Sequence, residues 1–188
     1  MKQKVYISGF LEQASYGKSA AVELIDKLQS EGYQVTEIKN HKENVWCRDY
    51  MPIITVANNL VQFRYAPGYM TDSKKWSERI PDQSDIQNEL DIKCKDATDI
   101  ILDGGVIEIL NDQGIISDRV FRENTNTDEI TLLTTINQLL GLKDLTVIPQ
   151  HPKDFTGHVN GLVRFIDRET VLINELNQRR SGRVGILF

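Results

Sequence analysis

Three short segments of this chain combine acidic, imidazole and glycine residues in a pattern that could do chemistry. They are Trp46-Cys47-Arg48-Asp49, Leu102-Asp103-Gly104-Gly105 and Thr156-Gly157-His158-Val159-Asn160-Gly161. Asp49 and Asp103 are 54 residues apart, and Asp103 and His158 are 55 residues apart. This regular spacing predicts a structural unit that is repeated around one shared site.

Two carboxylates and one imidazole are compatible with several reaction classes. A carboxylate such as Asp49 or Asp103 suits a guanidinium group, whose planar fork of N–H donors matches the two carboxylate oxygens. His158 can carry protons near neutral pH, and a neighbouring acid would fix its tautomer and raise its basicity. A metal hydrolase built on these three residues is an alternative, but the ligands are too scattered to predict a metal site.

Composition indicates one globular domain that binds neither nucleic acid nor membrane. The chain has 188 residues, of which 40% are hydrophobic and 26% charged, and its formal net charge is −5. The negative charge favours a small cationic ligand over a phosphate polymer.

Cys47 and Cys94 lack the spacing of a zinc site or a disulfide framework, so we expect a reducing compartment, the cytoplasm. The N-terminus lacks the apolar region of a signal peptide, and the sequence contains no stretch of about 20 apolar residues that could span a membrane.

The apolar pattern predicts an α/β fold in which hairpin, helix and strand recur, with each motif just before a hairpin. The expected strands are Lys4–Ile7, Val35–Ile38, Ile100–Leu102 and Leu145–Ile148, the expected hairpins are 53–65, 106–117 and 162–173, and the clearest helices are Ser19–Glu31 and Asp128–Leu140. We interpret the segment around positions 47 to 49 as extended.

Together the three motifs resemble those of a known enzyme family. Trp46 to Pro52, Asp103 to Gly105 and Asp154 to Phe165 are similar to the Trp-x-Arg-Asp, Glu/Asp-Gly-Gly and Gly-His-x-Asp motifs of the agmatine deiminases and bacterial peptidylarginine deiminases. Their order and separation also match. The similarity extends from the first strand to about Asn174.

This resemblance implies a pentein fold, an α/β propeller of ββαβ modules with pseudo-fivefold symmetry, of which this chain would hold about three modules. It also implies hydrolysis of a guanidine to a ureido group with loss of ammonia, through attack by a cysteine thiolate, without organic cofactor or metal. By motif match, Asp103 and His158 are the catalytic candidates. Asp49 would hold the guanidinium, Trp46 and Asn160 would contribute to the substrate site, and Gly104 and Gly105 would let backbone approach the ligand.

The chain departs from the family pattern in three respects. The family's nucleophilic cysteine lies in a last module that has no counterpart here, and we interpret Cys47 as a buried structural thiol. Asn160 replaces a usual aspartate, which removes a charge-assisted contact of about 1.5 to 3 kcal/mol. Residues 178–188 turn basic and then apolar, so we expect a partial deiminase-like domain over residues 1–177 followed by an atypical tail, in a reading frame that is interrupted near Asn177.

These observations predict a guanidine hydrolase acting on agmatine, arginine or peptidylarginine, with doubtful activity in this chain. The alternative is a guanidine-binding or interaction module without turnover. A phosphate-binding loop at Gly9 to Ser19 is a further alternative, but Glu12 stands where that motif requires glycine. An incomplete ring of modules would expose strand edges, so we also expect self-association.

Overall fold

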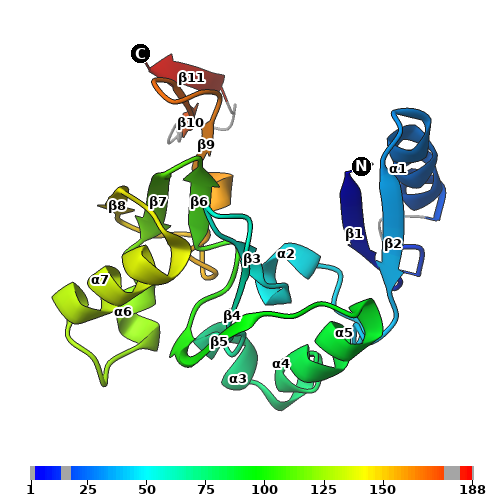
Figure 1. Cartoon of the computed structure of the whole chain (residues 1–188), viewed down its shortest axis with the longest axis horizontal. Helices are drawn as coiled ribbons and strands as arrows, with labels where there is room; N and C mark the ends of the chain where they lie inside the picture. The colour runs from blue at the N-terminus through cyan, green and yellow to red at the C-terminus, as the bar shows by residue number, and fades with distance from the viewer. Residues whose placement is uncertain (1–2, 14–17, 176–182, 188) are drawn as a thin grey trace. The chain divides into compact units, whose positions relative to one another are not determined.

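The computed structural model describes residues 3–13, 18–175 and 183–187, and for 175 and 183–187 only the backbone. The chain divides into two compact units, residues 1–51 with 70–93 and residues 52–69 with 94–188. Each unit is described by itself (Figure 1). The expected boundary between domain and tail at position 177 lies outside the described residues.

The first unit begins with a parallel βαβ arrangement. Strand β1 (Lys4–Ser8) pairs in parallel with β2 (Gln34–Ile38), and helix α1 (Lys18–Ser30) connects them. Gly32 follows the helix with a positive φ of 89°, a conformation that glycine adopts without a steric penalty. The predicted strands and helix of this region are therefore confirmed within two residues at each end.

Three further short helices lie in this unit. They are α2 (Cys47–Tyr50), α4 (Lys74–Ser77) and α5 (Gln83–Leu90), while α3 (Gly68–Thr71) spans the point where the two units join in sequence. Asp82 caps α5 by accepting the N–H groups of Ser84 and Asp85. Glu89 of the same helix accepts the N–H groups of Lys39 and Asn40, which fixes the end of β2.

In the second unit, two sheets share one topology. One sheet has the order β3 (Ile53–Ile54), β4 (Leu60–Arg64) and β5 (Lys95–Ile101), and the other has the order β6 (Ile107–Leu110), β7 (Gln113–Ser117) and β8 (Asp144–Ile148). In both, the first two strands form an antiparallel hairpin and the third runs parallel to the second. The predicted repeat of hairpin, helix and strand is thus present as a repeat of sheet topology.

A third sheet contains β9 (Val163–Phe165), β10 (Val171–Glu175) and β11 (Arg183–Leu187), all antiparallel. The 3₁₀ helix η1 (Val159–Gly161) precedes β9. Each of the three motifs lies in a connection from one sheet to the next: Asp49 between β2 and β3, Asp103 between β5 and β6, and His158 between β8 and β9. This placement explains their regular spacing, because one module separates successive connections.

Helices α6 (Arg119–Glu123) and α7 (Glu129–Leu140) complete the second unit and help to form its core. Asp128 caps α7 by accepting the N–H of Thr131, and Gly141 ends the helix with a φ of 72°. In the core, side chains of these helices pack against side chains from the strands of both repeated sheets. Its buried members include Val61, Phe63, Val106, Ile107, Ile116, Val120, Leu132, Ile136 and Leu140.

Some predicted element boundaries differ from those observed. The segment around positions 47 to 49 is a helical turn with Trp46 at its N-cap, so the extended conformation was wrong. The strand predicted at Ile100–Leu102 begins at Lys95 because its first half pairs with β4 despite a polar sequence. No helix in the described ranges is long and apolar enough to cross a membrane.

Two isoleucines of α7 test the assignment of its buried face. Ile136 is 0% exposed and Ile130 is 80% exposed. We expect Ile136→Ala to lower the free energy of unfolding by about 2 to 5 kcal/mol, because it leaves a cavity in the core. Ile130→Ala should change it by less than about 0.5 kcal/mol. Urea denaturation of both variants measures the difference, and equal losses would contradict this orientation of the helix.

Candidate functional site

Two loops of the second unit bring an acid and an imidazole together. Asp103, in the loop after β5, is only 3% exposed, and its Oδ1 atom accepts the N–H of Val106 at 3.1 Å. His158, in the loop before β9, places Nε2 3.3 Å from Oδ1 of Asp103. The fold therefore joins two predicted site residues that are 55 positions apart in the sequence.

Gly105 lies directly against the ring of His158. Its carbonyl accepts the N–H groups of Val159 at 2.9 Å and Asn160 at 3.3 Å, which ties the two loops together. A Cβ atom at position 105 would lie 2.5 Å from Nδ1 of His158, closer than carbon and nitrogen can approach. Glycine is therefore required at this position for the imidazole to occupy its place beside Asp103, and the neighbouring Gly104 is also buried.

Tyr69 adds a third polar group that the sequence did not reveal. Its hydroxyl donates to Oδ2 of Asp103 at 3.3 Å and lies 3.4 Å from Nε2 of His158. The rings of Tyr69 and His158 meet edge to face with centroids 6.2 Å apart. Tyr69 lies in the short helix α3, and the sequence around it resembles no motif. Only the tertiary structure therefore identifies it as a neighbour of Asp103 and His158.

Asp103, His158 and Tyr69 can hold and move a proton. With Nε2 protonated, His158 donates to one oxygen of Asp103 while the tyrosine hydroxyl donates to the other. A carboxylate in this position orients the imidazole and fixes which nitrogen carries the proton. The group is therefore suited to general acid and base catalysis.

Arg119 and Glu123 connect the segments that carry these side chains. Arg119 donates to the carbonyl of Phe155 at 2.6 Å and to Oε1 of Glu123 at 2.5 Å, and its guanidinium lies 5.1 Å from the centroid of the Tyr69 ring. Glu123 accepts the N–H of Gly68 with both oxygens. This largely buried ion pair, at positions i and i+4 of α6, thus supports both Tyr69 and the loop before His158.

Asp154 organises the His158 loop through its carboxylate. It accepts the N–H and hydroxyl of Thr156 at 2.9 and 2.7 Å and the N–H of His158 at 3.1 Å. Desolvation by burial raises the pKa of Asp154, but these hydrogen bonds and the proximity of His158 outweigh it, so the pKa is lowered from 3.8. The ionised form of Asp154 is the one that stabilises the loop.

Replacing Asp154 should therefore have a pH-dependent effect. A carboxyl group whose pKa is lower in the folded state adds stability above its unfolded pKa, and this stability is lost as pH falls through the folded value. We expect Asp154→Asn to lower the free energy of unfolding by about 1 to 3 kcal/mol at pH 7. The difference from wild type should shrink below pH 3.8. Urea denaturation across this range measures it, and a constant difference would be inconsistent with the ionised carboxylate.

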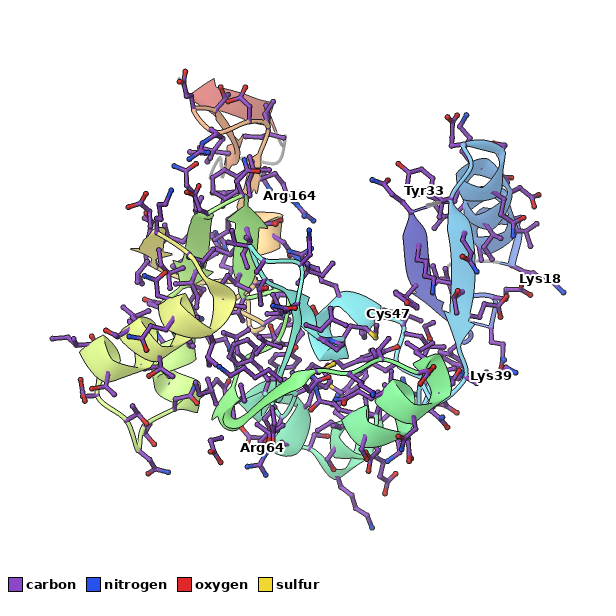
Figure 2. The ribbon with its side chains drawn as sticks, in the orientation of Figure 1. Lys18, Tyr33, Lys39, Cys47, Arg64 and Arg164 are labelled. Carbon is purple, nitrogen blue, oxygen red and sulfur yellow. The ribbon has the colours of Figure 1, made fainter. Side chains whose placement is uncertain are left out.

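Three other predicted site residues are Asp49, Trp46 and Asn160. Asp49 is buried in α2 of the first unit, and Trp46 at the start of that helix is 50% exposed. Asn160 lies in η1, and its carbonyl accepts Nε of Arg164 at 3.1 Å. Arg164, labelled in Figure 2, also forms an ion pair with Glu108.

Cys47, labelled in Figure 2, is a weakly acidic thiol. Burial raises its pKa to about 11, although a hydrogen bond from the hydroxyl of Tyr50 at 3.3 Å acts in the opposite direction. The thiolate, not the thiol, is the nucleophile. Cys47 is therefore protonated at neutral pH, in agreement with the structural role predicted for it.

The alkylation rate of Cys47 checks this protonation state. With a pKa of about 11, the thiolate fraction at pH 7.5 is small and rises about tenfold per pH unit up to that value. Iodoacetamide labelling of Cys94→Ser, followed by mass spectrometry at pH 7.5, 8.5 and 9.5, should show this increase. A fast rate that levels off near neutral pH would contradict the raised pKa.

A separate hollow of about 660 Å³ opens at the tips of three hairpins in the second unit. Asn58, Asn111 and Arg168 contribute to it from the turns of the β3–β4, β6–β7 and β9–β10 hairpins. Its lining includes none of Asp103, His158 and Tyr69. The hollow is therefore distinct from the group of residues that can move a proton.

Comparison with protein families places the chain in a known group. A model of the Porphyromonas-type peptidyl-arginine deiminases matches residues 3–185. The chain belongs to this family. No curated protein matches it.

Solved structures show the same fold at low sequence identity. C. jejuni agmatine deiminase superposes with a TM-score of 0.65 and 18% identity over 90% of this chain and 60% of its own. Agmatine deiminase of Enterococcus faecalis gives 0.60 and 14%, over 87% and 55% of the two chains. A dimethylarginine dimethylaminohydrolase gives 0.55 and 13%, over 92% and 70%. The predicted pentein fold is confirmed as an incomplete one, since the deiminase-family chain spans about 60% of the length of these agmatine deiminases.

Proposed function

We propose that this deiminase-family chain binds the guanidinium group of a small cation such as agmatine. The observation that carries the proposal is the buried contact between Asp103 and His158, with Tyr69 beside both. Asp103 and His158 lie in two of the segments that resemble the family's motifs, and the family model matches residues 3–185. Among the solved structures with this fold is a C. jejuni agmatine deiminase variant with substrate bound.

The proposed chemistry of the family site converts a guanidinium and water into a ureido group and ammonium. A thiolate attacks the guanidinium carbon, the bond from this carbon to one nitrogen breaks, and His158 supplies the proton with which that nitrogen leaves as ammonia. The carbon stays bonded to sulfur until water replaces the sulfur, which frees the thiolate and the ureido product. His158 then takes a proton from the incoming water. Asp103 holds the imidazole in the tautomer that both steps need, and Tyr69 steadies Asp103 through its second oxygen.

Substrate binding is assigned to residues of the three motifs. Asp49 accepts N–H donors of the guanidinium, and Trp46 forms part of the wall. Asn160 supplies one neutral acceptor where the family pattern has a carboxylate, which weakens the hold on the cation. Gly104 and Gly105 leave room for backbone beside the ligand.

A guanidine-binding module without turnover is the second candidate, and one observation favours it. The covalent route requires a thiolate, and burial keeps Cys47 protonated at neutral pH. Cys94 has a pKa that burial also raises. Of the two functions, binding depends only on the acidic and aromatic groups already described.

Calorimetry with agmatine and putrescine tests the proposal, because the two amines differ in the guanidinium group. We expect agmatine to bind more tightly than putrescine. Asp49→Asn should weaken agmatine binding by about 10- to 150-fold, the equivalent of about 1.5 to 3 kcal/mol for a charged hydrogen bond. The matched control is Asp99→Asn, which changes an exposed acid in β5. Equal affinity for the two amines, or equal effects of the two substitutions, would refute guanidinium recognition at this site.

An assay for ammonia and the ureido product separates the two candidate functions. The protonated state of Cys47 predicts no turnover by the wild-type chain above that of His158→Ala. If the wild-type chain turns over substrate and Cys47→Ser does not, Cys47 is the nucleophile. That result would favour hydrolysis over binding without turnover.

A further inference from the structure

The peptide between Asn160 and Gly161 combines the two residue types that favour loss of an asparagine side-chain amide. Glycine has no Cβ, so its backbone nitrogen can approach the side-chain carbonyl carbon of the preceding residue without steric hindrance. Asparagine is a thermolabile residue type. The sequence contains no other asparagine that is followed by glycine. Asn160 is therefore the asparagine of this chain whose side chain is least hindered from reacting with the next peptide.

The backbone around this peptide is held by a single turn. Asn160 is the middle residue of η1, in which the N–H of Leu162 donates to the carbonyl of Val159 at 2.8 Å. The i→i+3 pattern of this turn also directs the N–H of Gly161 toward the carbonyl of His158. Such hydrogen bonds have poor geometry, and one turn gains little from cooperativity. Local opening of η1 alone therefore releases the Gly161 nitrogen for reaction.

Solvent can reach the groups that react. Gly161 is exposed, Asn160 is half-buried, and within the described ranges the side-chain amide of Asn160 makes no hydrogen bond. Asn124 provides a contrast inside the same unit, because it is 9% exposed and is followed by threonine. Three hydrogen bonds of 2.8 Å hold its side chain to the backbone of Ile101 and Val120. The fold thus restrains Asn124 and leaves the side chain of Asn160 able to turn.

A positive charge lies beside the same peptide. Nε of Arg164, a residue labelled in Figure 2, donates to the carbonyl of Asn160 at 3.1 Å, while Nη1 pairs with Glu108. This charge-assisted hydrogen bond withdraws electron density from the peptide between Asn160 and Gly161. Its N–H is therefore easier to deprotonate, and that proton must leave before the nitrogen can attack.

We propose that Asn160 is a modification site at which the chain deamidates in water. The deprotonated nitrogen of Gly161 forms a bond to Cγ of Asn160, the bond from Cγ to Nδ2 breaks, and Nδ2 leaves as ammonia with a proton from solvent. Water then opens the cyclic imide. Attack at Cγ yields aspartate, and attack at the backbone carbonyl carbon yields isoaspartate. The net reaction exchanges an amide and water for a carboxylic acid and ammonia, so it needs no oxidant or reductant.

The product carries a negative charge next to the proposed guanidinium site. The N–H of Asn160 donates to the carbonyl of Gly105 at 3.3 Å, and Gly105 lies against the ring of His158. A carboxylate attached at this point attracts a cation more strongly than an amide does. Deamidation to aspartate therefore strengthens guanidinium binding. This consequence rests on the proposed function, whereas the modification itself does not.

Mass spectrometry tests the modification during an incubation long enough to convert the urea-unfolded chain. The folded wild-type peptide with position 160 should change by the mass difference between an amide and a carboxylic acid, and faster at higher pH. Gly161→Ala should react at least about tenfold more slowly, because the added Cβ hinders the nitrogen. Alanine fits at this position, since such a Cβ has no atom within 4 Å. Asn124 is the internal control and should stay unmodified. An unmodified Asn160, or equal rates in wild type and Gly161→Ala, would overturn the proposal.

Calorimetry with agmatine tests the effect of the new charge. Asn160→Asp should bind agmatine at least about tenfold more tightly than freshly purified wild type whose position 160 is still an amide. Equal affinities would overturn the predicted effect on binding. If neither protein binds agmatine while the wild type is modified on incubation, the guanidinium proposal is refuted and the modification site is upheld.

Discussion

The contact between Asp103 and His158 requires two loops from different sheets to be held within hydrogen-bond distance in a buried place. A buried carboxylate without partners would be costly, so its neighbours are as important as the imidazole itself. Val106 supplies a backbone N–H and Tyr69 a hydroxyl to the same side chain. The surrounding architecture can be understood as the means of keeping these donors on one carboxylate.

Backbone proximity makes this contact possible, and side chains beyond it keep it in place. Gly105 lets the imidazole lie against the loop that carries Asp103, where any Cβ would displace it. Asp154 fixes the start of the His158 loop, and Arg119 holds the carbonyl of Phe155 in the same loop. Glu123 links Arg119 to the backbone next to Tyr69. Changes at residues that cannot touch a ligand would therefore affect the position of the imidazole.

The same modular plan places the chemistry and sets the strand order of the repeated sheets. Each motif lies where the chain passes from one sheet to the next, while the repeated sheets are built from a hairpin and a parallel strand. The first unit has the parallel pair of this plan, and within the described residues its sheet lacks the hairpin strand. The positions of the three motifs along the chain are thus a consequence of one repeated topology.

The sequence by itself determined the family, the repeat and most elements, because these depend on local patterns. Asp128 and Gly141 marked the ends of α7, and motif order identified Asp103 and His158 as partners before any distance was known. The helical turn at Cys47–Tyr50 was missed since four residues give no periodicity to read. Only the tertiary structure decided the roles of Tyr69 and Arg119 and the raised pKa of Cys47. A hydroxyl in a short helix, an ion pair under a loop and a thiol with a raised pKa all owe their properties to neighbours that are distant in the sequence or to burial, and neither is written in a local pattern.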